Sequence, residues 1–481
     1  MKTPFLGGYG VSRSLNVSDN QLVNLFPEIV ETKDGKDVGA FYPAPGLTLK
    51  TTCGAGPIRG MAVWTLQGGT QVLLVVSGTQ VFLLTPSFAS TLCTGIALQS
   101  GSTACSIITN NTQAAIFFGG SATYQDGFGL VNNGSGYLVN SANVVSGISL
   151  PFSPSVGSNQ WWQSNLFDLS TWQALNFTSS AGAPDNVQAL FDIHREVWVL
   201  KSNETEIWAN AGLPGFAFQR LDGVYIQTGI SAPSSLAASG ESMLWLAQNS
   251  NGQAIVVEAV GYQVRPVSTQ ALTTIWQGYA TTADAEGFAF QQGGHRFYQI
   301  TFPTAGVSWR YDLTSSDLAG VPMWHQVAGF SAGQFTRHPA RTGVFFAGLN
   351  LVGDYQNGNI YALDPTAQLD NGAQRKWLRT WRALPKAVNM PMRFTALEIQ
   401  MMTGMQVPAG TAPQCMLRWS DDGGHSWSDQ RIAAAGPTGQ TAQRVKFNRL
   451  GATRRNTGLD RIFELSSTDQ FGVALTGAEL L

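Results

Sequence analysis

The sharpest motif that could carry local chemistry is a Ser-x-Asp-x-Gly-x-x-Trp turn in the C-terminal quarter, where the chain reads SDDGGHSW. It matches the pattern of an Asp-box and occurs once. The carboxylate can accept hydrogen bonds from turn amides, the glycine can adopt a positive φ, and the tryptophan can tuck the next strand under the hairpin. We therefore predict a structural turn without a catalytic role. Its residues are Ser420, Asp422, Gly424 and Trp427.

A basic run follows this turn, and within residues 431–461 the only acidic side chain is Asp460. Residues 371–481 carry 14 basic and 8 acidic side chains, whereas residues 1–370 carry 14 and 22. A solvated face, an interface with an acidic neighbouring subunit and phosphate contacts with DNA all fit this pattern. The candidate interface patch consists of Arg444, Lys446, Arg449, Arg454, Arg455 and Arg461.

Other reactive residues are scattered. Cysteines at 53, 93, 105 and 415 follow no metal-ligand spacing, and we expect buried thiols. The five histidines form no His-Glu-x-x-His pattern, and no nucleophile elbow or phosphate-binding loop occurs. We therefore expect no catalytic residues, no metal and no cofactor.

The composition indicates an all-β chain, because charged residues make up only 12 % and glycine occurs 53 times. From about residue 60 to 370, strand-turn-strand units recur with a period of about 50 residues, which is typical of propeller blades. We predict a β-propeller of five to seven blades; a pair of sandwich domains remains the alternative. The closing strands of four units centre on Ile207, Ile255, Ser308 and Ile360.

Three domains are predicted: an N-terminal segment at 1–55, the propeller at 56–370, and a β-rich, sandwich-like platform at 371–481. We expect the N-terminal segment to pack on the platform. The segment 158–185 interrupts the repeats and reads as a long loop or blade insertion. Its clustered Trp161, Trp162 and Trp172 would pack in a core or a subunit contact, or alternatively stack on sugar rings.

No membrane segment is expected, since the most apolar stretch, residues 71–84, is broken by Ser77, Gly78, Thr79 and Gln80. The N-terminus lacks the apolar region of a secretory signal. We expect the protein to stay in the compartment where it is made.

Three parts of the chain together resemble the tail hub, or tail nozzle, family of short-tailed bacteriophages, which contains the packaged-DNA stabilisation proteins. The first is VNLFPE at 23–28 with YPAPGL at 42–47, and the second is APD at 183–185 with TEIW at 205–208 and Gly212. The third covers LRWSDDGGHSWSD at 417–429, RLG at 449–451, Arg454, Arg455, DRIFEL at 460–465 and LTGA at 475–478.

The resemblance implies a structural virion protein, assembled in the host bacterial cytoplasm into a homo-oligomeric ring of six copies. Such a ring docks below the head-to-tail connector, surrounds the DNA channel, retains packaged DNA and offers attachment surface to fibres, spikes or a plug. Genomic DNA would pass without sequence-specific binding. Because DNA must slide through the channel, we favour the subunit interface as the role of the basic patch.

A glycan-binding or sialidase-like propeller of the phage tail is the alternative, since sialidases are propellers with Asp-boxes. A sialidase site needs an arginine cluster and a tyrosine nucleophile with a carboxylate partner. We expect no such site, because the arginines gather in the C-terminal part of the chain. The protein is therefore predicted not to be an enzyme.

Overall fold

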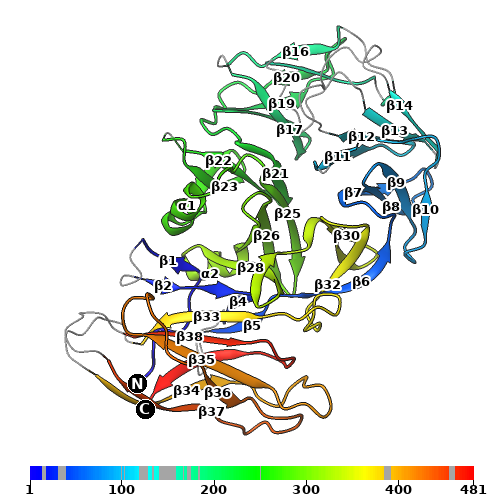
Figure 1. Cartoon of the computed structure of the whole chain (residues 1–481). Coiled ribbons are helices and arrows are strands. Elements are labelled where there is room, and N and C mark those ends of the chain that lie inside the picture. Colours follow the sequence, from blue (N-terminus) through cyan, green and yellow to red (C-terminus); the bar gives the residue numbers. More distant parts are fainter. Residues whose placement is uncertain are drawn as a thin grey trace.

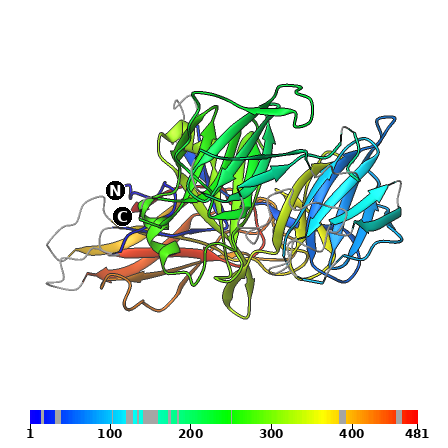
Figure 2. The same ribbon diagram turned by 90° about the horizontal axis from the view of Figure 1, so that it is seen from above.

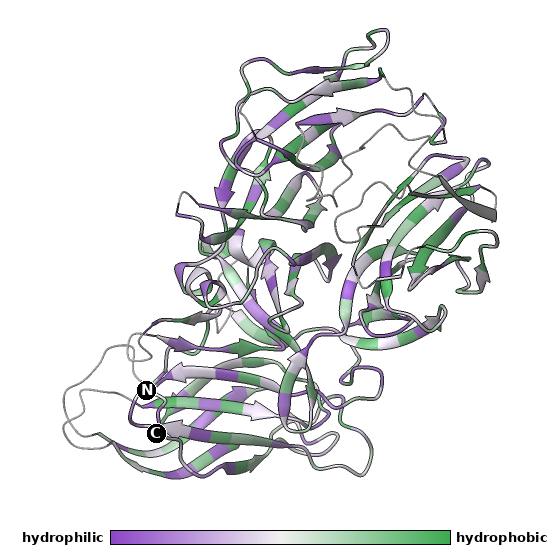
Figure 3. Ribbon diagram, turned by 45° about the horizontal axis from the view of Figure 1, so that its top comes forward, coloured by the Kyte–Doolittle hydropathy of each residue, from purple (hydrophilic) through white to green (hydrophobic). Residues whose placement is uncertain are grey.

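A computed structural model describes residues 1–13, 18–30, 39–98, 100–101, 103–118, 128–132, 135–139, 159–165, 167–170, 175–182, 185–249, 251–383, 392–453 and 461–481. Strands dominate it, and Figure 1 shows a ring of small sheets above a flat platform. Both termini lie in the platform, at one side of the ring (Figures 1 and 2). Hydrophobic residues are frequent along the strands (Figure 3), and strands such as Gln71–Ser77 and Ser242–Gln248 are buried over nearly their whole length, as expected for sheets covered on both faces.

The ring consists of antiparallel units of four strands; in the described residues five of these are separate four-stranded sheets, and a sixth is one end of a ten-stranded sheet. Most are simple meanders whose strands are joined by tight turns. In the turn between β25 (Glu286–Gln292) and β26 (His295–Phe302), Gly293 and Gly294 have φ of 60° and 85°, which a two-residue hairpin turn requires. The units are β7 (Ile58–Thr65), β8 (Gln71–Ser77), β9 (Gln80–Leu84) and β10 (Ser90–Leu92); β11 (Cys105–Thr109), β12 (Gln113–Phe118), β13 (Phe128–Asn132) and β14 (Ser135–Val139); β17 (Val187–Ile193), β18 (Glu196–Lys201), β19 (Thr205–Asn210) and β20 (Phe218–Arg220); β21 (Ala232–Ser239), β22 (Ser242–Gln248), β23 (Ala254–Val260) and β24 (Gln263–Pro266); β25 (Glu286–Gln292), β26 (His295–Phe302), β27 (Val307–Asp312) and β28 (Met323–Ser331); and β30 (Ala340–Phe346), β31 (Leu349–Asp354), β32 (Asn359–Asp364) and β6 (Gly46–Thr52).

Buried apolar side chains between neighbouring units hold the ring together. Trp198 of the third unit and Trp245 of the fourth share one cluster, and comparable clusters lie between each other pair of neighbours. A cluster with Ile58 and Phe346 joins the sixth unit to the first. Burying each such side chain contributes about 1.5–3 kcal/mol. The six interfaces together close the ring.

The last unit takes its outer strand from the other end of the chain. Strand β6 pairs antiparallel with β32, and Asp364 lies opposite Gly46 in the register. The N-terminal segment 1–55 therefore contributes to both domains, because β6 belongs to the propeller while the strands before it join the platform. Closure through a distant strand ties the ring to the N-terminal segment.

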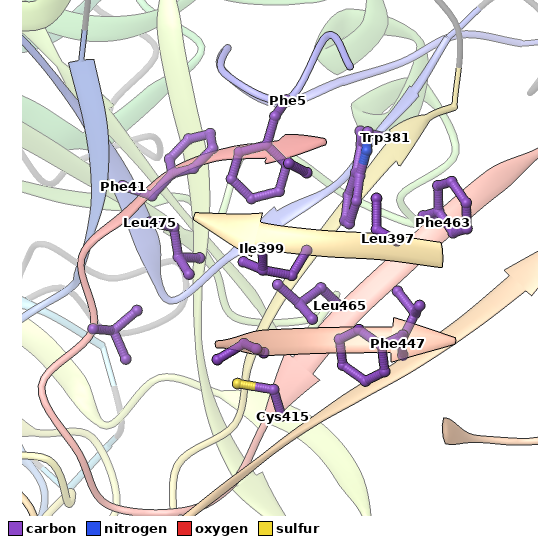
Figure 4. Close-up of a cluster of buried hydrophobic side chains, with 14 of the residues drawn as sticks. Phe5, Phe41, Trp381, Leu397, Ile399, Cys415, Phe447, Phe463, Leu465 and Leu475 are labelled. Carbon is purple, nitrogen blue, oxygen red and sulfur yellow. The ribbon is translucent and has the colours of Figure 1, made fainter. Parts of the chain in front are cut away.

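The platform is a sandwich of two sheets. One continues from β28 of the propeller through β3 (Leu22–Val23) into β33 (Trp377–Arg382), β38 (Ile462–Ser467), β35 (Gln414–Ser420) and β36 (Arg431–Ala434). The other contains β37 (Val445–Ala452), β34 (Arg393–Met401), β39 (Leu475–Leu480), β5 (Gly39–Pro43) and β4 (Leu25–Ile29). Phe5 and Phe41 from the N-terminal segment pack with Trp381, Leu397 and other C-terminal side chains in one core (Figure 4).

Shorter elements complete the fold: helices α1 (Gln270–Gln277) and α2 (Leu313–Ala319), and strands β1 (Gly10–Val11), β2 (Asp19–Asn20), β15 (Gln160–Trp162), β16 (Phe177–Ser179) and β29 (Gln334–Arg337). No described helix is long and apolar enough to span a membrane. Strands β15 and β16 pair with each other inside the predicted insertion. The all-β prediction, with a propeller and a β-rich platform that includes the N-terminus, is confirmed.

Candidate functional site

The Asp-box forms the turn that follows β35. The Asp422 carboxylate accepts hydrogen bonds from the Ser426 amide at 2.8 Å and from the Ser420 hydroxyl at 2.7 Å. Gly424 has φ of 88°, and its amide donates to the Ser420 Oγ at 2.8 Å. Bonds from Ser426 lower the pKa of Asp422, because they favour the charged carboxylate. Every polar group of the motif thus serves the turn.

Trp427 is half-buried, and the guanidinium of Arg418 lies over its ring at 4.7 Å. Arg418 in turn forms a bidentate pair with Glu464 on the neighbouring strand β38, at 2.8 and 2.7 Å. The tryptophan is therefore held against its own sheet. This geometry fits the structural role that the motif predicts.

Arg461, which the sequence analysis includes in the candidate interface patch, is buried inside the platform. Its side chain is 1 % exposed and forms a bidentate pair with Asp421 at 2.7 and 2.8 Å. Its Nη1 donates to the Leu450 carbonyl at 2.6 Å, and its guanidinium lies over the rings of Phe394 and Trp419. A guanidinium satisfied in this way can be buried, so Arg461 fastens the Asp-box turn to the platform interior.

The other residues of the patch differ in their surroundings. Arg444 is exposed and forms a bidentate pair with Glu398, which faces Lys446 across β34 and β37. Arg449 is exposed and has φ of 58°. Arg454 and Arg455 lie outside the described residues. Of the described patch residues, Arg461 is therefore not available at the surface, and the charge of Arg444 is balanced by Glu398.

A buried polar site joins the two domains, and its residues were not predicted individually. Asn24, next to β3, donates from Nδ2 to the carbonyls of Ala328 and Lys376 at 2.9 and 2.8 Å, and its Oδ1 accepts from the Ala328 amide. Its φ of 56° is one that asparagine tolerates better than most residues. The motif VNLFPE contained this signal, since Asn24 lies within it.

His295 forms a second contact between the domains. Its Nδ1 lies 2.8 Å from Asp312, and its Nε2 lies 3.4 Å from Glu28 on the platform strand β4. Ser315 donates to the Pro27 carbonyl at 2.8 Å. Burial lowers the pKa of His295, but Asp312 and Glu28 outweigh it, so that the pKa is raised.

Arg379 anchors the first residues of the chain. It is fully buried, donates to the Phe5 carbonyl from Nε and Nη2 at 3.0 and 2.6 Å, and lies over the ring of Phe41. Burial lowers its pKa to about 9. Buried arginine and asparagine side chains thus hold the N-terminal segment between propeller and platform.

A groove of about 530 Å³ lies at this junction. It is lined by residues 47–49 of β6, by residues 366–369, Asn371 and Gly372, and by the platform residues Gln406, Val407, Pro408 and Gln470. Gln368 Nε2 donates to the Gln406 carbonyl across the junction at 2.9 Å. The lining carries no charged side chain.

Neither the tryptophan cluster nor the cysteines form a reactive site in the described residues. Trp161 is 2 % exposed and packs edge-on against Trp208 and Phe216, which makes it a core residue. The Trp162 side chain and Trp172 lie outside the described residues. All four cysteines are buried free thiols, as predicted. No described group of three or more histidine, cysteine or acidic residues could hold a metal ion.

Solved structures resemble this chain only distantly. The extracellular domain of a hybrid two-component system protein from B. thetaiotaomicron matches at 10 % identity and TM-score 0.38, covering 79 % of this chain and 44 % of that one. PorZ, from the type-IX secretion system of Porphyromonas gingivalis, matches at 12 % and 0.33, with 80 % and 46 % covered. This chain thus spans less than half of each. Trypanosoma rangeli sialidase matches at 9 % and 0.31, covering 88 % and 91 %.

No curated protein sequence matches the chain significantly. The fold and the junction define a class of structural protein in which a propeller and a sandwich share one N-terminal segment. Two family models, described as the β-propeller and the β-sandwich of bacteriophage P22 Gp10, match residues 1–368 and 376–479. The chain belongs to the P22 Gp10 family, the tail hub or nozzle family of short-tailed phages, whose members are structural tail proteins.

Proposed function

We propose that the protein is one subunit of a homohexameric tail hub that docks below the head-to-tail connector and surrounds the DNA channel. In this role it retains the packaged genome until ejection and gives attachment surface to fibres, spikes or a plug. The observation that carries the proposal is the match of both family models, in order, across propeller and platform. The subunit would be made and assembled in the host bacterial cytoplasm.

The joint between the domains supports a structural role. A hub that closes a filled particle must transmit force without letting its domains turn against each other. Here one sheet runs from β28 through β3 into the platform, and β6 closes the propeller from the same N-terminal segment. Bending the joint would break these ladder hydrogen bonds and expose buried polar groups.

Charge supports a channel that does not grip DNA. The part of the chain up to residue 370 has eight more acidic than basic side chains, because it carries 22 against 14. Acidic side chains do not bind the phosphates of DNA. A part of the chain with more acidic than basic residues would therefore let DNA pass without sequence-specific binding.

In this proposal the remaining basic residues of the platform contact an acidic neighbouring subunit. Replacing both Arg454 and Arg455 by glutamate should leave the purified chain folded but reduce ring assembly, since like charges would then meet at the contact. A normal yield of rings from the double variant would show that these two residues are not part of the interface.

A particle assay tests the proposal as a whole. Phage grown without this protein should fill heads and then lose DNA, measured as nuclease-sensitive genome per head, and supplying the chain from a plasmid should restore retention. Particles that keep their DNA without it would overturn the retention role. Native mass spectrometry should find assemblies of six 51.5 kDa subunits when connector is added.

A further inference from the structure

A cluster of arginines lies where the innermost strands of neighbouring units begin. Arg341 on β30 and Arg337 on β29 grip one carboxylate: their Nη2 atoms donate to the two oxygens of Glu286 at 2.5 and 3.0 Å. The side chains of Arg337, Arg341 and Glu286 are 11 %, 4 % and 10 % exposed. Two guanidiniums thus share one carboxylate in a nearly buried place.

A third arginine adds to the positive charge. Arg59 on the neighbouring strand β7 is 2 % exposed and donates to the carbonyls of Thr103 and Gly78 at 2.8 and 3.0 Å. Burial raises the pKa of the Cys105 thiol, and the charges of Arg59 and Arg341 both act in the opposite direction. Strand β7 packs against β30, so Arg59 and Arg341 belong to neighbouring strands.

The positive charge of the pair is not fully balanced by Glu286. The Nε atoms of Arg337 and Arg341 are buried and have no hydrogen-bond partner. Burial lowers the pKa of Arg337, and the charge of Arg341 lowers it further, although Glu286 acts in the opposite direction. Buried cations that lack counter-charge are costly, and an anion would relieve that cost.

We propose that this cluster, Arg337 and Arg341 around Glu286, binds one small oxyanion per chain, with Arg59 on the neighbouring strand adding positive charge. Guanidinium groups match the oxygen spacing of carboxylates and phosphates, which makes a phosphate or carboxylate group the fitting ligand. The site belongs to the propeller alone and does not depend on the tail hub proposal.

Calorimetric titration of the purified full chain tests the site. Sodium phosphate and sodium acetate are each titrated against a sodium chloride background of equal ionic strength. We expect binding at one site per chain, and the tighter of the two anions identifies the ligand class. Absence of binding for both anions would overturn the proposal.

Two variants with opposite expected effects on anion binding make the test specific. Arg341→Met should abolish binding, whereas Glu286→Gln, which removes the competing carboxylate, should lower Kd about tenfold. The matched control is Arg265→Met, because Arg265 is an exposed propeller arginine paired with Glu258, and it should bind like the wild type. Should Arg341→Met fail to fold, the Glu286→Gln arm decides: unchanged or weaker binding would contradict the site.

Discussion

Asn24 and Ala328 exchange two hydrogen bonds of 2.9 Å each, side-chain amide to carbonyl and backbone amide to side-chain oxygen. One residue belongs to the N-terminal segment of the platform and the other to the propeller strand β28. A single buried side chain therefore imitates a strand partner and joins the two domains.

Replacing Asn24 by alanine should lower the free energy of unfolding by about 2–3 kcal/mol, because three hydrogen bonds are lost and alanine must adopt a φ of 56°. Urea denaturation measures the loss, and limited proteolysis should cut the joint faster. Asn251→Ala, at an exposed turn, is the control and should change little. Equal stability of the two variants would show that the hydrogen bonds of Asn24 do not stabilise the contact between the domains.

Arg461→Met should destabilise the platform by about 3 kcal/mol, since the change leaves Asp421 without its partner inside the protein. Arg444→Met is the matched control. It breaks a bidentate pair with Glu398, but that arginine is 66 % exposed and its pair is screened by solvent, so we expect little change in stability. Chemical denaturation measures the free energy of unfolding of both variants. A similar decrease in both would show that the buried pair of Arg461 stabilises the platform no more than the exposed pair of Arg444.

His295 should make the joint sensitive to pH. Its pKa is raised above the ordinary 6.5 in the folded chain, so its stabilising contribution is complete below that value and is lost as pH rises through the folded pKa. The stability difference between wild type and His295→Gln should therefore shrink from pH 6 to pH 8. His194→Gln, at an exposed turn, controls for general effects. A folded pKa below 6.5, read by NMR titration, would refute the assignment.

The thiols should be unreactive in the folded chain. Burial raises the pKa of Cys93 and Cys105 to about 11 and of Cys53 and Cys415 to about 12, so almost no thiolate forms at pH 8. Labelling by a disulfide reagent should be slower than in denaturant by about two orders of magnitude. Fast labelling of any one thiol would show that its region opens readily.

The sequence carried the repeating part of the fold well. A period of about 50 residues with Gly-rich turns is a local pattern, and it was sufficient to predict a propeller. Strand β6 was different: it lies more than 300 residues from its partner β32, and nothing in its own residues indicates that pairing. The resemblance to a known family, resting on both ends of the chain, is confirmed by the two family models.

The candidate site was predicted less well, for a physical reason. Arginine side chains usually lie at the surface, so the sequence alone suggests that Arg461 belongs to the basic patch. Its burial depends on Asp421, the Leu450 carbonyl and two aromatic rings, which only the folded sheets bring together. The same holds for Arg337 and Arg341, whose shared partner Glu286 lies about 50 residues earlier in the chain.

The most direct test of the central proposal is cryo-electron microscopy of the parent virion's tail. The account predicts a ring of six copies directly beneath the connector, each with its propeller and platform in the relative orientation shown here (Figure 1). A ring that surrounds the DNA channel would also show which neighbour meets the basic residues of the platform. Absence of the chain from the tail, or a peripheral position away from the channel, would contradict the proposal.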